Sequence, residues 1–218
     1  MKYALVGITC LVLVLAFVVG NNYYQEQQAQ KYGFLAAENA ELFIRDHSRT
    51  FGSDDAKVYL VEFMDPACET CAAFAPFIKQ IMDANPGKIK LVLRYAPFHD
   101  GADDFVKILE AAAMQGKYWE TLNLMFATQN IWANHHNYQP ERLWEILPRA
   151  GVDIEQIKKD MHDPAIAKII AQDMADVRAL DVQKTPGYFV NGKPLQVFGY
   201  RQLSELIQSE LIAQYPKE

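Results

Sequence analysis

The sequence contains very little cysteine, with only Cys10, Cys68 and Cys71 among 218 residues. A disulfide-stapled fold needs several pairs, so we expect this fold to be held together by an apolar core. Two neighbouring thiols supply half the ligands of a usual structural zinc site, and we predict no metal centre and no bound cofactor. Positive charge is also scarce, since 21 Lys and Arg residues stand against 27 Asp and Glu, for a net charge of −6. This balance argues against a nucleic-acid partner.

One long uncharged apolar run lies at the N-terminus, from Tyr3 to Gly20. As a helix it would be roughly 27 Å long, close to the ~30 Å hydrocarbon thickness of a bilayer. Residues 1–20 are therefore predicted to be a transmembrane anchor or a cleavable signal, with the anchor favoured because the run exceeds a usual signal core. Lys2 precedes the run, which favours export of the following chain to the extracytoplasmic (periplasmic) face of the inner membrane.

The rest of the sequence predicts an α/β fold. Residues 21–50 are interpreted as a polar linker that contains a short helix over 34–46, and 47–55 as a turn-rich segment. Apolar runs predict two strands, and apolar residues at helical spacing predict helices between and after them. The predicted elements are strands over 57–64 and 88–95, a helix over 68–83, a helical block over 102–180, a hairpin of 188–190 with 195–198, and a helix over 201–214. Within the helical block, Pro140 near the start and Gly151 just past the end bracket one helix.

The chemistry is concentrated in Cys68-Glu69-Thr70-Cys71, where the first strand gives way to a helix. A thiol at a helix N-terminus faces unpaired N–H groups and the positive end of the helix dipole, and both stabilise its thiolate. We therefore predict that Cys68 is the nucleophile that forms a mixed disulfide. Cys71, one turn further along the helix, is predicted to resolve it.

Glu62 is a single acid on a strand face that it shares with Val58, Leu60 and Met64. Burial among apolar side chains would raise its pKa, which would suit a group that takes the proton from Cys71 during exchange. The alternative interpretation places Glu62 at the sheet margin, in contact with solvent.

Two motifs together resemble the DsbA-like branch of the thioredoxin superfamily. They are Val61-Glu-Phe with Cys68-x-x-Cys71, and Val182-x-x-Thr-Pro-x-x-Phe-Val-Asn-Gly192. The resemblance covers about residues 50–215. It implies a thioredoxin fold in two parts, 51–100 and 183–218, with a helical insertion over 101–182.

The resemblance also implies roles for residues that local patterns do not reveal. Pro186 would be a cis proline lying against the cysteine pair, and the backbone of Thr185 would bind a substrate segment in β fashion. Glu62 matches the family's buried acid, six positions before the first cysteine. In better-known oxidases of the branch, Pro-His stands between the cysteines, whereas this chain has Glu69 and Thr70. These two residues are candidates for tuning the redox potential, toward a more reducing pair.

The predicted function is thiol–disulfide exchange on cysteine-containing exported proteins, with the direction (oxidase, reductase or isomerase) left open. A membrane redox partner would recycle the dithiol. A second hypothesis is a copper-binding thioredoxin-fold protein that holds Cu(I) on Cys68 and Cys71 with a third ligand such as His99. A third is a binding module with a structural disulfide. The adjacent His135 and His136 are interpreted as solvated loop residues rather than a metal site.

Overall fold

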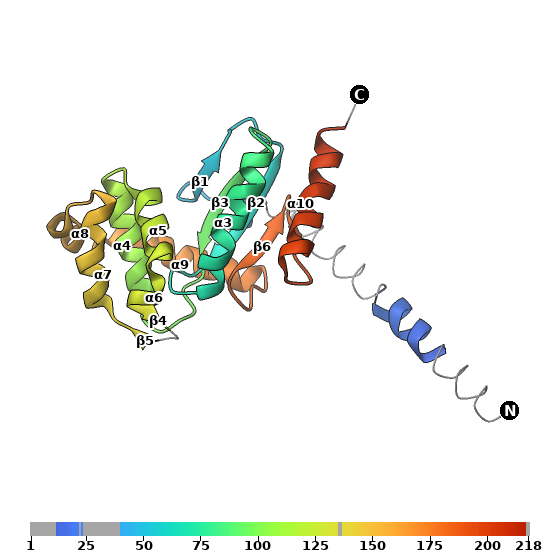
Figure 1. Ribbon diagram of the computed structural model, residues 1–218, viewed down its shortest axis with the longest axis horizontal. Helices are drawn as coiled ribbons and strands as arrows, with labels where there is room; N and C mark the ends of the chain where they lie inside the picture. Colours follow the sequence, from blue (N-terminus) through green and yellow to red (C-terminus); the bar gives the residue numbers. More distant parts are fainter. Residues whose placement is uncertain (1–11, 22, 24–39, 135–136, 217–218) are drawn as a thin grey trace.

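The computed structural model describes residues 12–21, 23, 40–134 and 137–216 (Figure 1). Residues 12–21 are helical, but no helix within the described part of the chain is long and apolar enough to span a membrane. The predicted span 3–20 begins outside these residues, so the anchor or signal stays a prediction. Residues 34–39 of the helix predicted over 34–46 also lie outside them. Of the described remainder, α2 (Ala40–Phe43) is helical and 44–46 are not, so the helix ends earlier than predicted.

A five-stranded sheet forms the centre of the fold, in the order β1-β3-β2-β6-β7. The central strands β2 and β3 are parallel, and each edge is completed by antiparallel pairing. Their side chains are almost all buried, as expected for apolar strands that are covered on both faces. The strands are β1 (Arg49–Gly52), β2 (Val58–Met64), β3 (Ile89–Tyr95), β6 (Gly187–Val190) and β7 (Lys193–Pro194).

Helices cover both faces of the sheet (Figure 1). On one face, α3 (Glu69–Ala84) and α10 (Tyr200–Gln214) bury apolar side chains at helical spacing against β2 and β6. On the other face, the apolar cluster joins Phe43 of α2 and Val177 of the helix α9 (Pro164–Ala179) to Phe63 and Phe189 of the sheet. The alternating side chains of β2 thus belong to two separate cores.

The helical insertion lies between β3 and β6 in the sequence and forms a lobe beside the sheet (Figure 1). A short antiparallel pair, β4 with β5, interrupts the predicted helical block. Pro140 at the start of α7 and the left-handed Gly151 after its 3-10 extension bracket one helical segment, as the sequence predicted. The elements are α4 (Ala102–Met114), α5 (Tyr118–Ala127), α6 (Gln129–Trp132), β4 (Ala133–Asn134), β5 (Asn137–Tyr138), α7 (Pro140–Ile146), a 3-10 turn (Leu147–Ala150), α8 (Ile154–Asp160) and α9.

Two sequence predictions about strands are wrong in detail. The segment 47–55, predicted to be turns, contains the edge strand β1, whose exposed residues give no alternating apolar pattern. The returning strand of the hairpin is β7, only two residues long, rather than 195–198. Beyond Pro194 one more hydrogen bond joins the two segments, from the amide of Leu195 to the carbonyl of Tyr188 at 2.8 Å.

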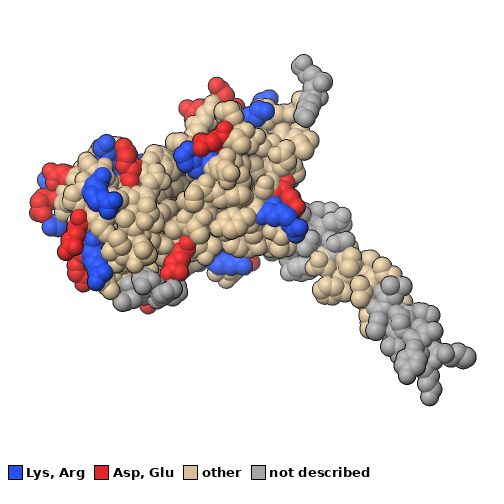
Figure 2. Space-filling model, in the orientation of Figure 1, with Lys and Arg blue, Asp and Glu red and all other residues tan. Residues whose placement is uncertain are grey.

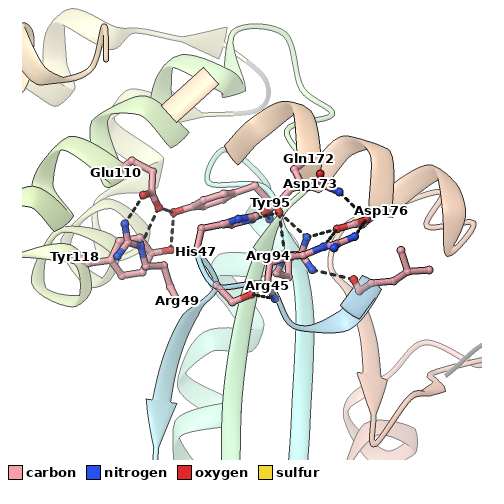
Figure 3. Close-up of polar contacts among 12 residues, drawn as sticks. Arg45, His47, Arg49, Arg94, Tyr95, Glu110, Tyr118, Gln172, Asp173 and Asp176 are labelled. Carbon is pink, nitrogen blue, oxygen red and sulfur yellow. Dashed lines mark hydrogen bonds and ion pairs between the residues drawn. The ribbon is translucent and has the colours of Figure 1, made fainter. Parts of the chain in front are cut away.

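A buried polar network, shown in Figure 3, ties the insertion to the sheet. Arg94 of β3 is completely buried and lies 2.6 Å from carboxylate oxygens of both Asp173 and Asp176 of α9. Residues that precede β1 join the same carboxylates, with Arg45 2.8 Å from Asp176 and His47 Nε2 2.6 Å from Asp173. The chain segment before β1 is thus fastened to a helix more than 120 residues later in the sequence.

A second branch of the network reaches α4 (Figure 3). Arg49 pairs with the buried carboxylate of Glu110, which also accepts a 2.6 Å hydrogen bond from the hydroxyl of Tyr95. The Tyr95 hydroxyl in turn lies 3.0 Å from that of Tyr118 on α5. Hydrogen bonds and ion pairs therefore join strand β3 to three helices of the insertion, α4, α5 and α9.

Candidate active site

Cys68, the predicted nucleophile, lies where β2 ends and α3 begins. After Met64 the chain turns tightly, with the amide of Cys68 donating to the carbonyl of Asp65 at 3.0 Å. Cys68 has extended backbone angles and caps α3, whose first residue is Glu69. Its side chain thus lies at the exposed N–H groups of the first turn, and only 5% of the residue is exposed.

The surroundings of Cys68 lower the pKa of its thiol to about 6. The largest contribution is the Cys71 thiol, which lies against the Cys68 sulfur, and the side chain of Thr185 and the amides of Cys71 and Thr70 add to it. Burial acts in the opposite direction but is outweighed. At neutral pH Cys68 is therefore mainly a thiolate.

Cys71 differs strongly from its neighbour. It is completely buried, and burial, followed by the neighbouring Cys68 and Glu62, raises its pKa well above the ordinary value. The two thiols thus have separate states near neutral pH, one ionised at the helix end and the other protonated. This asymmetry suits one nucleophile and one resolving thiol.

The loop before β6 approaches Cys68 from the other side. The Thr185–Pro186 peptide bond is cis, as the family resemblance implied, and Pro186 is buried. The Cys68 Sγ lies 3.5 Å from the carbonyl oxygen of Thr185, to which it donates as a thiol. A Cβ added at Gly187 would be 2.7 Å from Val182, so the loop packs too closely for a larger residue there. The two motifs, 117 residues apart, meet at the Cys68 sulfur.

Glu62 lies in the middle of β2, opposite Tyr188 in the register with β6. Only 5% of the residue is exposed, which contradicts the alternative of a solvated acid at the sheet margin. Burial raises the pKa of Glu62 to about 8, helped by the charge of Cys68 and opposed in part by the Tyr188 hydroxyl. An acid with this pKa accepts and releases protons near neutral pH.

The intervening residues Glu69 and Thr70 are exposed on the first turn of α3. The amide of Thr70 contributes to the stabilisation of the Cys68 thiolate. His99, proposed above as a third copper ligand, lies in the loop after β3 with its Nδ1 2.7 Å from the carboxylate of Asp65.

Sequence reasoning did not single out Asp65. It is completely buried three residues before Cys68, and a polar residue that ends an apolar strand next to the motif was the available signal. No group of three His, Cys, Asp or Glu side chains that could hold a metal ion occurs among the described residues, and His135 and His136 lie outside them. The copper hypothesis stays a prediction that the geometry does not favour.

An aromatic cluster beside the site was also not predicted. Phe74, one turn after Cys71, stacks on Tyr200 with ring centroids 4.1 Å apart and lies 4.8 Å from Phe198. These contacts fix the loop after β7 against α3. Trp132, by contrast, is completely buried in the insertion and lines no groove.

Comparison with known proteins agrees with this geometry. A family model described as thioredoxin matches residues 45–209. A crystal structure of a thioredoxin-like oxidoreductase from Silicibacter pomeroyi DSS-3 superposes with a TM-score of 0.67 and 26% identity, covering 78% of this chain and 95% of that one. Oxidised BdbD from Bacillus subtilis superposes with a TM-score of 0.66 and 23% identity, covering 75% and 92%.

The fold and the cysteine site together define the class, a protein with a thioredoxin fold, and the similar structure from Silicibacter pomeroyi is described as a thioredoxin-like oxidoreductase. The chain belongs to the thioredoxin family.

The chain is also similar in sequence to part of much longer proteins. The Na(+)/H(+) antiporter NhaA 1 of Mycolicibacterium gilvum is 33% identical over 156 residues, which are 68% of this chain and 24% of the antiporter. The antiporter NhaA of Herminiimonas arsenicoxydans is 30% identical over 151 residues, 69% of this chain and 23% of that protein. The chain spans about a quarter of the length of these relatives.

Proposed function

We propose that this protein is a protein disulfide oxidoreductase that exchanges disulfides with cysteine-containing exported proteins. The observation that carries the proposal is the meeting of two motifs at one sulfur. Cys68 begins α3 with a pKa of about 6, and the carbonyl of Thr185, next to the cis proline, lies 3.5 Å from it. A structural disulfide or a chance cysteine pair would need neither the lowered pKa nor the adjacent loop.

In the reducing direction the exchange starts with the Cys68 thiolate. It attacks one sulfur of a substrate disulfide, the substrate S–S bond breaks, and the other substrate sulfur leaves as a thiolate and takes a proton. The ionised form of Glu62, the minor form near pH 7, then accepts the proton of Cys71, whose sulfur attacks Cys68 in the mixed disulfide and releases the second substrate thiolate. The substrate gains two electrons and the Cys68–Cys71 pair is oxidised. The oxidising direction is the same sequence reversed.

Thr185 and Pro186 are proposed to position the substrate. The backbone at Thr185 lies beside the Cys68 sulfur at the start of β6. An extended substrate segment that pairs with this backbone would bring its own cysteine to Cys68. Main-chain hydrogen bonds do not depend on the side chains of the substrate. This suits an enzyme that acts on many exported chains.

The lowered pKa bears on the redox direction. Near pH 7 a thiol with a pKa of about 6 rather than 9.0 stabilises the dithiol form by about 1.4 kcal/mol, from the thiolate fractions of the two cases. For a two-electron couple this makes the disulfide about 30 mV more oxidising. Repulsion from Glu69 acts the other way, so the direction is decided by the measured potential.

The proposed location is the extracytoplasmic (periplasmic) face of the inner membrane, supported by the uncharged run 3–20. There a membrane redox partner would recycle the dithiol, and no cofactor besides the cysteine pair is needed. A nucleic-acid partner is not proposed, because acidic and basic side chains are interspersed on the face in Figure 2 and the net charge is −6.

The test is the equilibrium reduction potential of the pair, titrated against glutathione with the Cys68→Ser variant as the inactive control. A value near −120 mV would indicate a dithiol oxidase, and one near −200 mV or below a reductase or isomerase. Failure of the wild-type pair to exchange with glutathione would refute the enzymatic proposal.

A further inference from the structure

The carboxylate of Asp65 connects the turn that carries Cys68 to the loop after β3. It is completely buried and accepts hydrogen bonds from the amide of Ala67 at 2.8 Å, of Phe98 at 2.8 Å and of His99 at 2.9 Å. Its own carbonyl accepts from the amide of Cys68. One acid thus fixes the backbone of the turn that carries Cys68 and of the loop after β3.

The side chain of His99 supplies a fourth donor. Its Nδ1 lies 2.7 Å from the Oδ2 that already accepts from the amides of Phe98 and His99. A carboxylate only accepts hydrogen bonds, so this partner assigns the proton to Nδ1, in the neutral and in the protonated ring alike. The imidazole therefore always directs an N–H toward Asp65.

Asp65 lies next to the nucleophile, because its carbonyl accepts the amide of Cys68 at 3.0 Å. The ring of Tyr138 makes an edge contact with His99, with centroids 6.2 Å apart. The pKa of Tyr138 is raised to about 12, first by burial and then by the negative charges of Asp65 and Cys68. The tyrosine thus lies within electrostatic range of both groups, and Asp65 is only three residues from Cys68.

We propose that Asp65 and His99 are a positioning pair that sets the electrostatic potential at Cys68 from outside the Cys-x-x-Cys motif. The motif itself holds Glu69 and Thr70 and contains no imidazole. A buried anion three residues from a thiolate opposes its ionisation, unless donors neutralise the anion. Three of the four donors are backbone amides, and His99 is the adjustable one. The inference rests on the proposed exchange function and names the residues that tune it.

Substitution of His99 separates tuning from simple loop support. His99→Met keeps the volume but removes the donor, whereas the amide nitrogen of His99→Asn can still donate to Asp65. His162→Met, on the exposed turn after α8, is the matched control. The measurement is the pH dependence of Cys68 alkylation, together with the glutathione potential and the thermal midpoint of each variant.

The expected result is that His99→Met slows alkylation about threefold near pH 5, from a pKa rise of about half a unit, and makes the pair more reducing. His99→Asn and His162→Met are expected to titrate like the wild type. If Cys68 alkylation depended on pH in the same way in His99→Met and in the wild type, the proposal would be overturned. A lowered thermal midpoint alone would mean that the pair only supports the loop. Equal effects of Met and Asn would also overturn it.

Alkylation does not require disulfide exchange. A wild-type pair that fails to exchange with glutathione therefore refutes the proposed function, while the alkylation titration of His99→Met still tests the positioning pair.

Discussion

The contact between the two thiols gives the sharpest quantitative prediction. Cys71 is the largest contributor to the low pKa of Cys68, and it acts by donating from its protonated sulfur. Cys71→Ala removes this donor, and Cys71→Ser replaces it with a hydroxyl. Both variants keep the backbone amide of residue 71, which also contributes, so the pair of variants isolates the side chain.

The magnitude follows from the energy of one hydrogen bond to a charged acceptor, about 1.5–3 kcal/mol. At 1.36 kcal/mol for each pKa unit, its loss in Cys71→Ala raises the pKa of Cys68 from about 6 to roughly 7 or 8. The Ser variant is expected to remain near 6. Thiolate absorbance and iodoacetamide alkylation, each followed against pH, measure this directly.

Below the pKa, alkylation of the Ala variant should be at least about tenfold slower than that of the Ser variant. Identical titration curves for the two variants would show that the helix end, and not the second thiol, stabilises the Cys68 thiolate. The Cys71 thiol would then have no part in lowering the pKa of Cys68.

Three further predictions follow from the same site and from the network of Figure 3. Thr185→Val removes a second donor and is expected to slow Cys68 alkylation a fewfold near pH 5, while the unfolding midpoint stays close to that of the wild type. Glu62 keeps its proton up to a pKa of about 8 when folded but ionises above about 4.5 when unfolded, so it lowers stability as pH rises between these values. In urea unfolding, the stability of Glu62→Gln relative to the wild type should therefore increase by about 2–3 kcal/mol as the pH rises from 5 to 7. If the unfolding free energies of the two proteins changed in parallel with pH, burial would not raise the pKa of Glu62. Arg94→Met leaves two buried carboxylates without their shared partner and should cost about 3–5 kcal/mol, against less than about 1 for Lys79→Met at an exposed pair.

Patterns that depend on neighbouring residues were predictable from the sequence. The apolar run of β2, the helical spacing of α3 and the bracketing of one helix by Pro140 and Gly151 each appear within one segment, and each was confirmed. The position of Cys68 at the end of a helix follows from the same patterns. The edge strand β1 was missed because an exposed strand has no periodic apolar signal.

Contacts between distant segments were not predictable in this way. The cis peptide bond at Pro186 was predicted only from the family resemblance, because few X–Pro bonds are cis and no local pattern marks one. The partners of Arg94 lie 79 and 82 residues away, and no local pattern marks a buried arginine. Asp65 looks like an ordinary turn residue until its four donors are seen.

The pairing of β2 with β6 has a consequence for the order of events during synthesis. Glu62 lies opposite Tyr188, and Cys68 touches Thr185, yet the whole helical insertion is made between these residues. A nascent chain that ends within the insertion therefore carries both cysteines but has no Thr185 beside them and no Tyr188 beside Glu62. The contacts of Cys68 with Thr185 and of Glu62 with Tyr188 form only when the last segment of the chain has been made.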